Sequence, residues 1–520
     1  MDEIDLKIVE YFFTNVDKKV FFARNLHPEV WALFQARYSR SVEGVREGFI
    51  NLLKEAPEEY ENVRKMFSEN KTPNIEMEYA LNKAIKFMDK WVLGYGHSSV
   101  AEGACVGICV ENVSILATKY VETSRLSSFI EKSTRYVKFT RDSFYKPIEI
   151  TNSEFSEDYD RVVNLLFDTY EKLQKPVLEH VMKVTENNKE INEKAWVRAC
   201  GARRFDAVRY ILPAATMTSF GWTVNARELA HAIRKMNSHP LSEIKTIGNE
   251  MVVEGRKVLP SLLKYTEPLE YLSYTEKGLF INTETNSKYS NNEVKLLSAP
   301  SKEDFENVLA CALIHKNSLL SYDESLNKIK NMNETEKLNL IKEAVKGMSS
   351  HDLPPREFEN INLKWEIVMD YGGYRDLQRH RIMTQSEQLL TTFLGYEIPP
   401  DIENSGCLKD YIHAMQEADK LFRKMYEKMP YEAQYLVPLA FRKRILVEMN
   451  YRALHHFIRI RSSPHGHFSY RNIVQKMYLI MLEKYGKELM SSLECNFDNV
   501  DLGRLKGELK IESMKGVKDE

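Results

Sequence analysis

The chain has 520 residues, a length that corresponds to two to four domains of ordinary size. Lys and Arg number 73 against 75 for Asp and Glu, so the formal net charge is -2 and the basic excess typical of a general nucleic-acid binder is missing. Hydrophobic residues make up 43% and charged residues 28%, which excludes a long disordered chain and provides enough apolar material for more than one core.

The sequence carries no sign of a membrane span or of secretion. No segment reaches the ~18 consecutive apolar residues that cross a bilayer, and the N-terminus, MDEIDLKIVEYFF, is acidic where a secretory signal is basic. The six cysteines are scattered and include no Cys-x-x-Cys pair. We therefore expect reduced, buried thiols, no metal site, and a cytoplasmic protein that binds neither membranes nor nucleic acid.

Helical spacing of apolar residues dominates the chain. Apolar residues recur at intervals of three and four in five segments: 76–92, 157–186, 303–315, 408–429 and 471–486. Two shorter segments, 104–116 and 363–370, favour strands because they are rich in β-branched residues or partly alternate. We expect the few prolines mainly at segment edges, as at Pro176, Pro240, Pro354 and Pro464. The pattern predicts an α+β fold in which helices outweigh a small sheet.

Two segments on either side of the midpoint repeat one pattern. Residues 212–244 and 437–470 each contain an apolar residue and Pro, then Asn-x-Arg-x-Leu-x-His, an apolar and basic helical turn, and a stretch of Ser, Pro and His. The interval from the proline to the asparagine is 12 residues in both. Chance similarity of two helices is the alternative, but the identical spacing favours duplication.

The stretch 276–302 is rich in Thr, Ser, Asn and Lys and is the best candidate for a linker between the two copies. We therefore expect a first repeat over residues 1–275, a linker over 276–302 and a second repeat over 303–520. Each repeat should be mostly helical, with a small mixed or antiparallel sheet.

Arg379-His380-Arg381 is the densest cationic point in the sequence. Three such side chains in a row cannot all be solvated on one helix face, so at least one points inward or toward a ligand. Arginine forks suit the oxygens of phosphate or carboxylate groups. A surface turn paired with Asp376 and Glu387 is the simpler interpretation, and the motif alone does not decide between the two.

Glu131, Ser133 and Arg135 alternate along the chain. In an extended segment they place an acceptor, a hydroxyl and a cation on one side, a set that can hold a sugar phosphate. A polar strand edge is the alternative and is more frequent for such a pattern.

Several other polar residues have two interpretations. Arg209 and Arg461 each border an apolar stretch, where an arginine either extends toward solvent, which is the default, or points into a pocket. His97 is either a core histidine or, with Ser99 and the following helix start, part of a site for an anion.

Taken together, these segments resemble the flavin-dependent thymidylate synthase family of the ThyX type. Its hallmark is Arg-His-Arg, seven residues and Ser-x-Arg-Tyr. A His-x-Ser-x-x-Glu segment precedes the hallmark, and Leu-Pro, Asn-x-Arg-x-Leu and a further Arg follow it. The resemblance covers about residues 90–260 and again about 350–490, so the chain resembles two family domains in tandem.

The hallmark is divided between the two repeats. The first repeat has Thr-Ser-Arg at 123–125 in place of Arg-His-Arg but keeps Glu131, Ser133 and Arg135. The second repeat keeps Arg-His-Arg at 379–381 but has lost the Ser and the Arg that should follow.

The same division recurs downstream. The arginine before Leu-Pro is Arg209 in the first repeat and Gln434 in the second, whereas the late arginine is Met236 in the first and Arg461 in the second. Random decay is the alternative, but it would not preserve one complete set divided between the halves at several points.

Family members are homotetramers whose sites combine residues from several subunits. The resemblance therefore implies a homodimer of this chain that imitates the tetramer. One class of site would keep the residues of both repeats, and the other class would lack most of them and be inactive. Whether the complementing halves meet within one chain or between two chains stays open at this point.

The resemblance implies reductive methylation of dUMP to dTMP, with methylene-tetrahydrofolate as the one-carbon donor and NADPH reducing bound FAD. It implies that Arg379 and Arg461 are catalytic and that the nucleotide contacts Glu131, Ser133, Arg135, Arg209, Arg379 and Arg461. The implied FAD contacts are His97, Ser99, Asn225, Arg379, His380, Arg381, Ser386, Glu387, Asn450 and His456.

One departure from the family bears on the substrate. Asp376 stands where the family has a Gln that contacts the pyrimidine. This change supports one alternative, flavin-dependent modification of another pyrimidine nucleotide. A second alternative is a non-catalytic homologue that binds nucleotides without a flavin.

Overall fold

The computed structural model describes residues 1–17, 22–37, 45–69, 78–90, 98–185, 192–278, 293–349 and 351–516. These residues form two compact units. Unit 1 comprises Met1–Glu111, Ser124–Glu131 and Ser219–Asn282, and unit 2 comprises Asn112–Thr123, Lys132–Thr218 and Thr283–Glu520. The predicted linker, 276–302, lies partly outside the described residues, and the predicted domain boundaries stay a prediction.

Unit 1 holds most of a three-stranded sheet with the strand order β1-β3-β2. The strands are β1 (Cys105–Ser114), β2 (Ser127–Glu131) and β3 (Met217–Asn225), and β2 runs antiparallel to β3. The helices of this unit are α1 (Glu3–Phe12), α2 (Pro28–Arg37), α3 (Val45–Lys54), α4 (Pro57–Ser68), α5 (Glu78–Met88), η2 (Ser98–Gly103), α10 (Ala226–Ser238), α11 (Ser242–Gly255) and α12 (Glu270–Gly278).

Unit 2 contains a four-stranded antiparallel sheet with the order β4-β5-β7-β6. Its strands are β4 (Val294–Ser298), β5 (Asn362–Asp370), β6 (Thr384–Glu387) and β7 (Arg442–Asn450). The long central pair runs from Asn362 opposite Asn450 to Asp370 opposite Arg442. Trp365 and Val447 face each other in this register and are both fully buried, so the pair forms the middle of the core.

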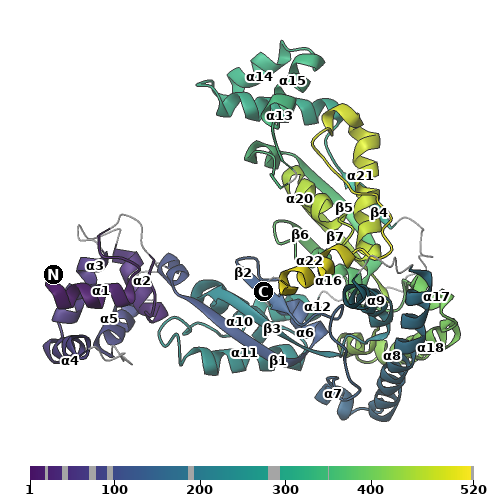
Figure 1. The fold of residues 1–520 in the computed structure, drawn as a ribbon, viewed down its shortest axis with the longest axis horizontal. Helices are drawn as coiled ribbons and strands as arrows, with labels where there is room; N and C mark the ends of the chain where they lie inside the picture. Colours follow the sequence, from purple (N-terminus) through teal and green to yellow (C-terminus); the bar gives the residue numbers. More distant parts are fainter. Residues whose placement is uncertain are drawn as a thin grey trace. The chain divides into compact units, whose positions relative to one another are not determined.

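The first repeat contributes five helical segments to unit 2: α6 (Ile115–Val121), α7 (Ile148–Thr151), α8 (Ser156–Val184), α9 (Glu193–Val208) and η3 (Arg209–Ile211). The rest of the unit supplies α13 (Lys302–Lys316), α14 (Tyr322–Lys330), α15 (Glu334–Ala344), η4 (Arg356–Asn360), α16 (Tyr371–Gln378), α17 (Pro400–Asn404), α18 (Leu408–Tyr426), α19 (Pro430–Ala433), η5 (Gln434–Leu436), α20 (Tyr451–Arg461), α21 (Phe468–Leu489) and α22 (Leu505–Gly516). In Figure 1, α8 and α18 pack side by side, which brings the two repeats together.

The α+β class is confirmed, and so are the predicted elements. The five helices correspond to α5, α8, α13, α18 and α21, and the two strands correspond to β1 and β5. Among the described residues, no helix combines the length and the apolar character needed to cross a membrane.

Two smaller expectations are wrong. Pro176 lies inside α8 and not at its edge. One missing N–H is tolerated there because the 29-residue helix buries apolar residues on both sides of it. All six cysteines are free thiols, but Cys105 and Cys109 are exposed because they occupy alternate, exposed positions of β1, an edge strand of its sheet.

The chain crosses itself at Pro213 and Pro438, the equivalent prolines of the two repeats, which form an antiparallel bridge in unit 2. Four backbone hydrogen bonds of 2.8–3.0 Å flank the bridge: from Ala214 to Val437, from Leu439 to Leu212, from Ala215 to Tyr435 and from Ala440 to Tyr210. Each bond has its counterpart in the opposite direction. The crossing is therefore isologous, the kind of contact that two identical subunits make.

Equivalent tyrosines of the two repeats also make the same hydrogen bond. The Tyr159 hydroxyl donates to the Tyr145 carbonyl at 2.9 Å, and the Tyr411 hydroxyl donates to the Glu397 carbonyl at 2.6 Å. Both tyrosines lie in the first turns of the paired helices α8 and α18. The structure therefore supports the duplication inferred from the sequence.

Candidate functional site

Arginines from the two repeats converge on Tyr470 in unit 2. Arg135, from the first repeat, donates from Nη1 to the Tyr470 hydroxyl at 3.3 Å, and its guanidinium lies 6.0 Å from the ring centroid. Arg461, from the second repeat, has its guanidinium 5.4 Å from the same centroid. Two members of the divided hallmark set therefore lie on one ring within a single chain.

Asp206 of α9 holds the guanidinium fork of Arg135, which consists of Nε and Nη2. Nε and Nη2 of Arg135 donate to the two carboxylate oxygens at 2.7 and 2.9 Å. Arg504 donates to the same two oxygens at 2.8 and 2.7 Å. Burial alone would raise the pKa of the Asp206 carboxyl, but Arg135, with Arg504, holds it below its usual range. Asp206 is thus a fixed anion shared by two guanidinium groups.

His467 connects this cluster to the start of α21. Its Nδ1 accepts from the Ser469 N–H at 3.3 Å, and its Nε2 lies 3.1 Å from the Asp206 carbonyl oxygen. Since Nδ1 accepts and Nε2 donates, the ring is neutral with its proton on Nε2. Burial and the charge of Arg209 lower the pKa of His467 well below its ordinary value, in agreement with the neutral form.

Arg461 is held by two residues of its own repeat. Its Nε donates to His380 Nε2 at 2.8 Å, and its Nη1 lies 3.3 Å from an Asp376 carboxylate oxygen. An arginine Nε always carries its proton, so His380 Nε2 must accept and the proton of the ring sits on Nδ1. Burial, followed by Arg461, lowers the pKa of His380 well below its usual value. His380 is therefore a neutral ring that can still donate one hydrogen bond.

Arg209 is a buried cation that forms no ion pair with a carboxylate in the described part of the chain. Its side chain is almost fully buried, its Nη2 donates to the Gly372 carbonyl at 3.3 Å, and its Nε has no hydrogen-bond partner among the described residues. Burial lowers the pKa of this guanidinium. A buried charge in this state is costly unless an anion compensates for it. Of the predicted site residues, Arg209 thus gives the clearest indication of an anionic ligand.

Asp370 lies near Arg209 and begins α16. One of its oxygens accepts from the Gly373 N–H at 2.6 Å as the N-cap, and the other accepts from the Ser469 hydroxyl. Burial raises the pKa of Asp370 to about 6 although these hydrogen bonds and Arg209 oppose the shift. A Cβ at Gly373 would lie 2.8 Å from Ser469 Oγ, so glycine lets α16 start against α21.

The α16 helix presents a row of cations to the site. Arg375 is buried and donates to the Thr134 hydroxyl, next to Ser133, at 3.2 Å. Arg379 at the helix end is exposed, and its side chain forms no hydrogen bond or ion pair with any residue the structure describes. Arg381 is half-buried in the turn that leads to β6.

Glu387 and Asn450, two further predicted residues of unit 2, have structural partners. Glu387, on β6, forms an ion pair with the buried Lys443, and Ser386 beside it is exposed. Asn450 is the N-cap of α20 and accepts from the Ala453 N–H at 2.8 Å.

His456, also on α20, has a buried Nδ1 that lacks a hydrogen-bond partner among the described residues. Its ring lies 5.8 Å from that of His380. Burial, followed by Arg459, lowers the pKa of His456, so the ring favours its neutral form.

Three predicted residues belong to unit 1, and one lies outside the described residues. Glu131 is half-buried at the end of β2 opposite Phe220, and Ser99 is exposed in η2. Asn225 caps α10 by accepting from the Glu228 N–H at 2.9 Å. His97 is the residue outside the described part of the chain.

The positions that have lost the hallmark arginines are used structurally. Gln434 accepts from the Leu390 N–H and donates to the Tyr431 carbonyl, both at 3.0 Å, so its amide satisfies nearby backbone groups. Met236 is buried in the core of unit 1. Neither residue supplies a charge.

Reasoning from the sequence missed Asp206, Asp370, Arg375, Tyr470 and Arg504. Only Asp206 could have been suspected from the sequence, because it precedes Arg209 by three residues on a helical stretch and therefore lies on the same helix face. Nothing in the local pattern marks Tyr470 or Arg504, since both act through contacts with residues far away in the sequence.

Comparison with known proteins places this site in context. A family model described as "Thymidylate synthase complementing protein" matches residues 33–261 and 295–485. The chain is 30% identical to a UPF0159 protein of Chlamydia pneumoniae over 97% of both chains and 29% identical to one of Chlamydia muridarum over 96% of both. It is also 29% identical to a flavin-dependent thymidylate synthase of Clostridium tetani over 36% of this chain and 72% of that relative.

We expect Asp370→Asn to change the pH dependence of stability. Between the unfolded pKa of 3.8 and the folded value of about 6, the folded state keeps a proton that the unfolded state releases. The stabilisation from this group is complete below the unfolded pKa and is lost as the pH rises through the folded value. Asn stays neutral, so the variant should gain thermal stability over the wild type at about pH 7 and lose that advantage at about pH 4.5. An equal difference at both pH values would contradict the assignment.

Arg209→Met should raise the thermal midpoint of the ligand-free protein by about 2–4 °C, because it removes a buried cation that has no carboxylate partner. It should also abolish any stabilisation by added inorganic phosphate. Arg203→Met is the matched control on α9, since Arg203 is paired with Asp401 at 2.7 and 2.8 Å and its loss should lower the midpoint. A fall in the midpoint of Arg209→Met would show that Arg209 is compensated within the protein.

Proposed function

The chain belongs to the family described as "Thymidylate synthase complementing protein", and from this membership we propose that it is a flavin-dependent thymidylate synthase. The proposed reaction transfers the one-carbon unit of methylene-tetrahydrofolate to dUMP and reduces it, with NADPH as the source of electrons, to give dTMP. The observation that carries the proposal is the cluster of Arg135, Arg209 and Arg461 in one chain.

The arginine cluster suits a nucleotide monophosphate. Arg209 is a buried cation without a carboxylate partner among the residues that the structure describes, and a phosphate group would supply the missing negative charge. Arg135 keeps its Nη1 edge toward Tyr470 while Asp206 holds the opposite edge of the fork. In this proposal Ser133 and Arg135 hold the phosphate with Arg209, and Arg461 contacts the uracil edge. A cation there also stabilises negative charge that develops on the base.

The residues also fit FAD, which supplies hydride transfer when bound. Arg379 is an exposed guanidinium with no partner in the described part of the chain, and the buried Nδ1 of His456 lacks one as well. His380 can donate from Nδ1 while Arg461 occupies its Nε2. We propose that these three residues, with Arg381, hold the flavin, and that Arg379 also reaches the nucleotide. Ser386, Glu387 and Asn450 complete the proposed set in unit 2, and the roles of Glu131, Ser99 and Asn225 in unit 1 stay predictions.

Asp376 supports a second candidate substrate. A carboxylate only accepts hydrogen bonds, whereas the Gln of the family both accepts and donates. The pair of Asp376 with Arg461 restores an acceptor beside a donor, which suits uracil but also suits a pyrimidine with an amino group, such as cytosine. Modification of another pyrimidine nucleotide is therefore the second candidate.

The isologous crossing supports a homodimer as the assembled form. One chain already contains the contact that two subunits of an undivided family member would make, so two chains would imitate the tetramer. We propose this dimer together with a cytoplasmic location.

Purified protein should carry the absorption of bound FAD and should rescue a thymidine-requiring strain that lacks its own thymidylate synthase. Protein without flavin that cannot be reconstituted with FAD would contradict both enzyme proposals and favour a non-catalytic nucleotide binder. Bound FAD without rescue would favour the other pyrimidine substrate. Arg423→Ala, a surface change on α18, is the control that should rescue normally.

Arg135→Ala and Arg461→Ala should each abolish dTMP formation, because each removes a cation that lies over the same Tyr470 ring. Mixed dimers of the two variants should stay inactive, because both residues of a site come from one chain. Recovery of about one site for each mixed dimer would show instead that the halves combine between chains.

A further inference from the structure

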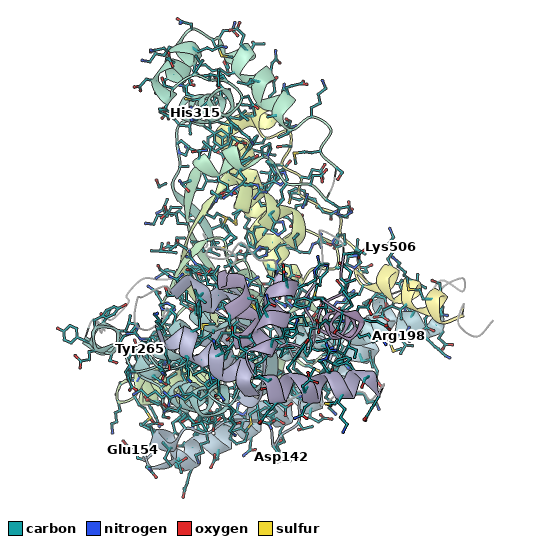
Figure 2. All side chains as sticks on the ribbon, turned by 90° about the vertical axis from the view of Figure 1, so that its left-hand side faces the viewer. Asp142, Glu154, Arg198, Tyr265, His315 and Lys506 are labelled. Carbon is teal, nitrogen blue, oxygen red and sulfur yellow. The ribbon has the colours of Figure 1, made fainter. Side chains whose placement is uncertain are left out.

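The segment 495–516, which we call the C-terminal strap, lies beyond the residue where the family match ends, 485. The strap nevertheless packs against the rest of unit 2 along most of its length. The Arg471 side chain donates to the Asp498 carbonyl at 2.8 Å, and Arg203 donates to the Asp501 carbonyl at 3.1 Å. Arg198 of α9 forms ion pairs with Glu508 and Glu512 of α22. Figure 2 shows Arg198 and Lys506 at the same edge of the molecule.

Arg504 connects the strap to the loop that carries Ser133 and Arg135. Its Nη2 donates to both carboxylate oxygens of Asp206, its Nη1 donates to the Arg135 carbonyl at 3.3 Å, and its guanidinium lies 4.7 Å from the ring centroid of Tyr136. Arg504 therefore touches the backbone of one motif residue, the ring of the next, and the carboxylate that orients the Arg135 fork.

The charges explain why a second arginine matters here. Arg135 and Asp206 alone form a neutral pair, which has little attraction for a phosphate group. Arg504 adds a positive charge to the same carboxylate, so the cluster of three carries a net charge of about +1 while Asp206 keeps the Arg135 fork in one orientation. His467, which touches the Asp206 carbonyl, adds no charge because it is neutral.

The strap leaves space beside this cluster. A cavity of about 360 Å³ lies between the strap, the loop around His465 and the end of α9, with Asp206 and Arg504 among its lining residues. The backbone of the strap comes very close to that loop at one point, because a Cβ at Gly503 would lie 1.9 Å from the Pro464 carbonyl oxygen. Arg504 is thus held at the edge of an open space.

We propose that Arg504 is a positioning and charge-restoring residue of the phosphate site: by sharing Asp206 with Arg135, it keeps the Ser133–Arg135 loop both oriented and cationic for a phosphomonoester. This inference rests on the proposed function for the identity of the nucleotide, but its electrostatic basis holds for any phosphomonoester. The strap is accordingly part of the binding site and not an appended tail.

The test compares binding of dUMP, inorganic phosphate and deoxyuridine to the full-length protein by titration calorimetry. Arg504→Ala should weaken dUMP and phosphate about 10- to 100-fold, the size expected for charge-assisted hydrogen bonds, and should leave deoxyuridine unchanged because it has no phosphate. Arg504→Lys should recover part of the affinity, since it restores the charge without the two separate donor nitrogens of the guanidinium. Arg423→Ala is the matched control, because Arg423 also pairs with a carboxylate, Asp419, and lies 5.1 Å from an aromatic ring centroid.

A second pair of variants tests the strap without changing any charge. Gly503→Ala must displace the strap at Pro464 and should weaken phosphate binding, whereas Gly507→Ala, where a Cβ meets nothing within 4 Å, should not.

Unchanged dUMP and phosphate affinity in Arg504→Ala would overturn the inference. An equal loss of deoxyuridine affinity would also overturn it, because such a loss indicates a merely structural role. Wild-type protein that binds phosphate but not dUMP would refute the proposed substrate and leave the inference standing. Wild-type protein that binds neither phosphate nor dUMP would refute both the proposed substrate and the inference about Arg504.

Discussion

The backbone crossing at Pro213 and Pro438 is the constraint on which the candidate site depends. It fixes the chain of the first repeat against that of the second by reciprocal hydrogen bonds, so the segments beside it cannot move independently. Arg209 comes four residues before the first proline, and Gly372, the acceptor of its guanidinium, also donates its own N–H to Leu439, one residue after the second. The crossing thus provides the scaffold that brings a cation of one half to the start of α16 in the other half.

The charges of the site depend on this scaffold because few of its arginines have a carboxylate to themselves. Arg135 and Arg504 share Asp206, Arg461 has Asp376 at 3.3 Å, and Arg209 has no ion-pair partner among the described residues. Folding this region therefore leaves positive charge partly uncompensated in a buried setting, which costs stability. Such a cost is typical of a site whose charge is balanced by its ligand.

The sequence predicted the cations of the site better than their partners. Arg135, Arg209 and Arg461 belong to a pattern with fixed spacing, and the helices and strands around them follow from apolar periodicity, which is a local property. Asp206, Tyr470 and Arg504 could not be found in this way, because their roles depend on distances between residues that are far apart in the sequence. Pro176 shows the opposite error. A local rule predicts proline at the edge of a helix, but the packing of the long helix α8 keeps this proline in its interior.

Fusion of two copies also explains in physical terms why one set of arginines is absent. In a symmetric dimer every position occurs twice, so an arginine at the position of Arg209 would appear on both sides of the crossing and leave a second buried cation to be compensated. A fused chain can keep one and replace the other. Gln434 occupies the second position and satisfies the Leu390 N–H and the Tyr431 carbonyl, which a guanidinium, having no acceptor, could not do for the N–H. The loss of one arginine thus removes a second buried cation and satisfies a buried backbone group, while the retained arginine keeps the charge for the ligand.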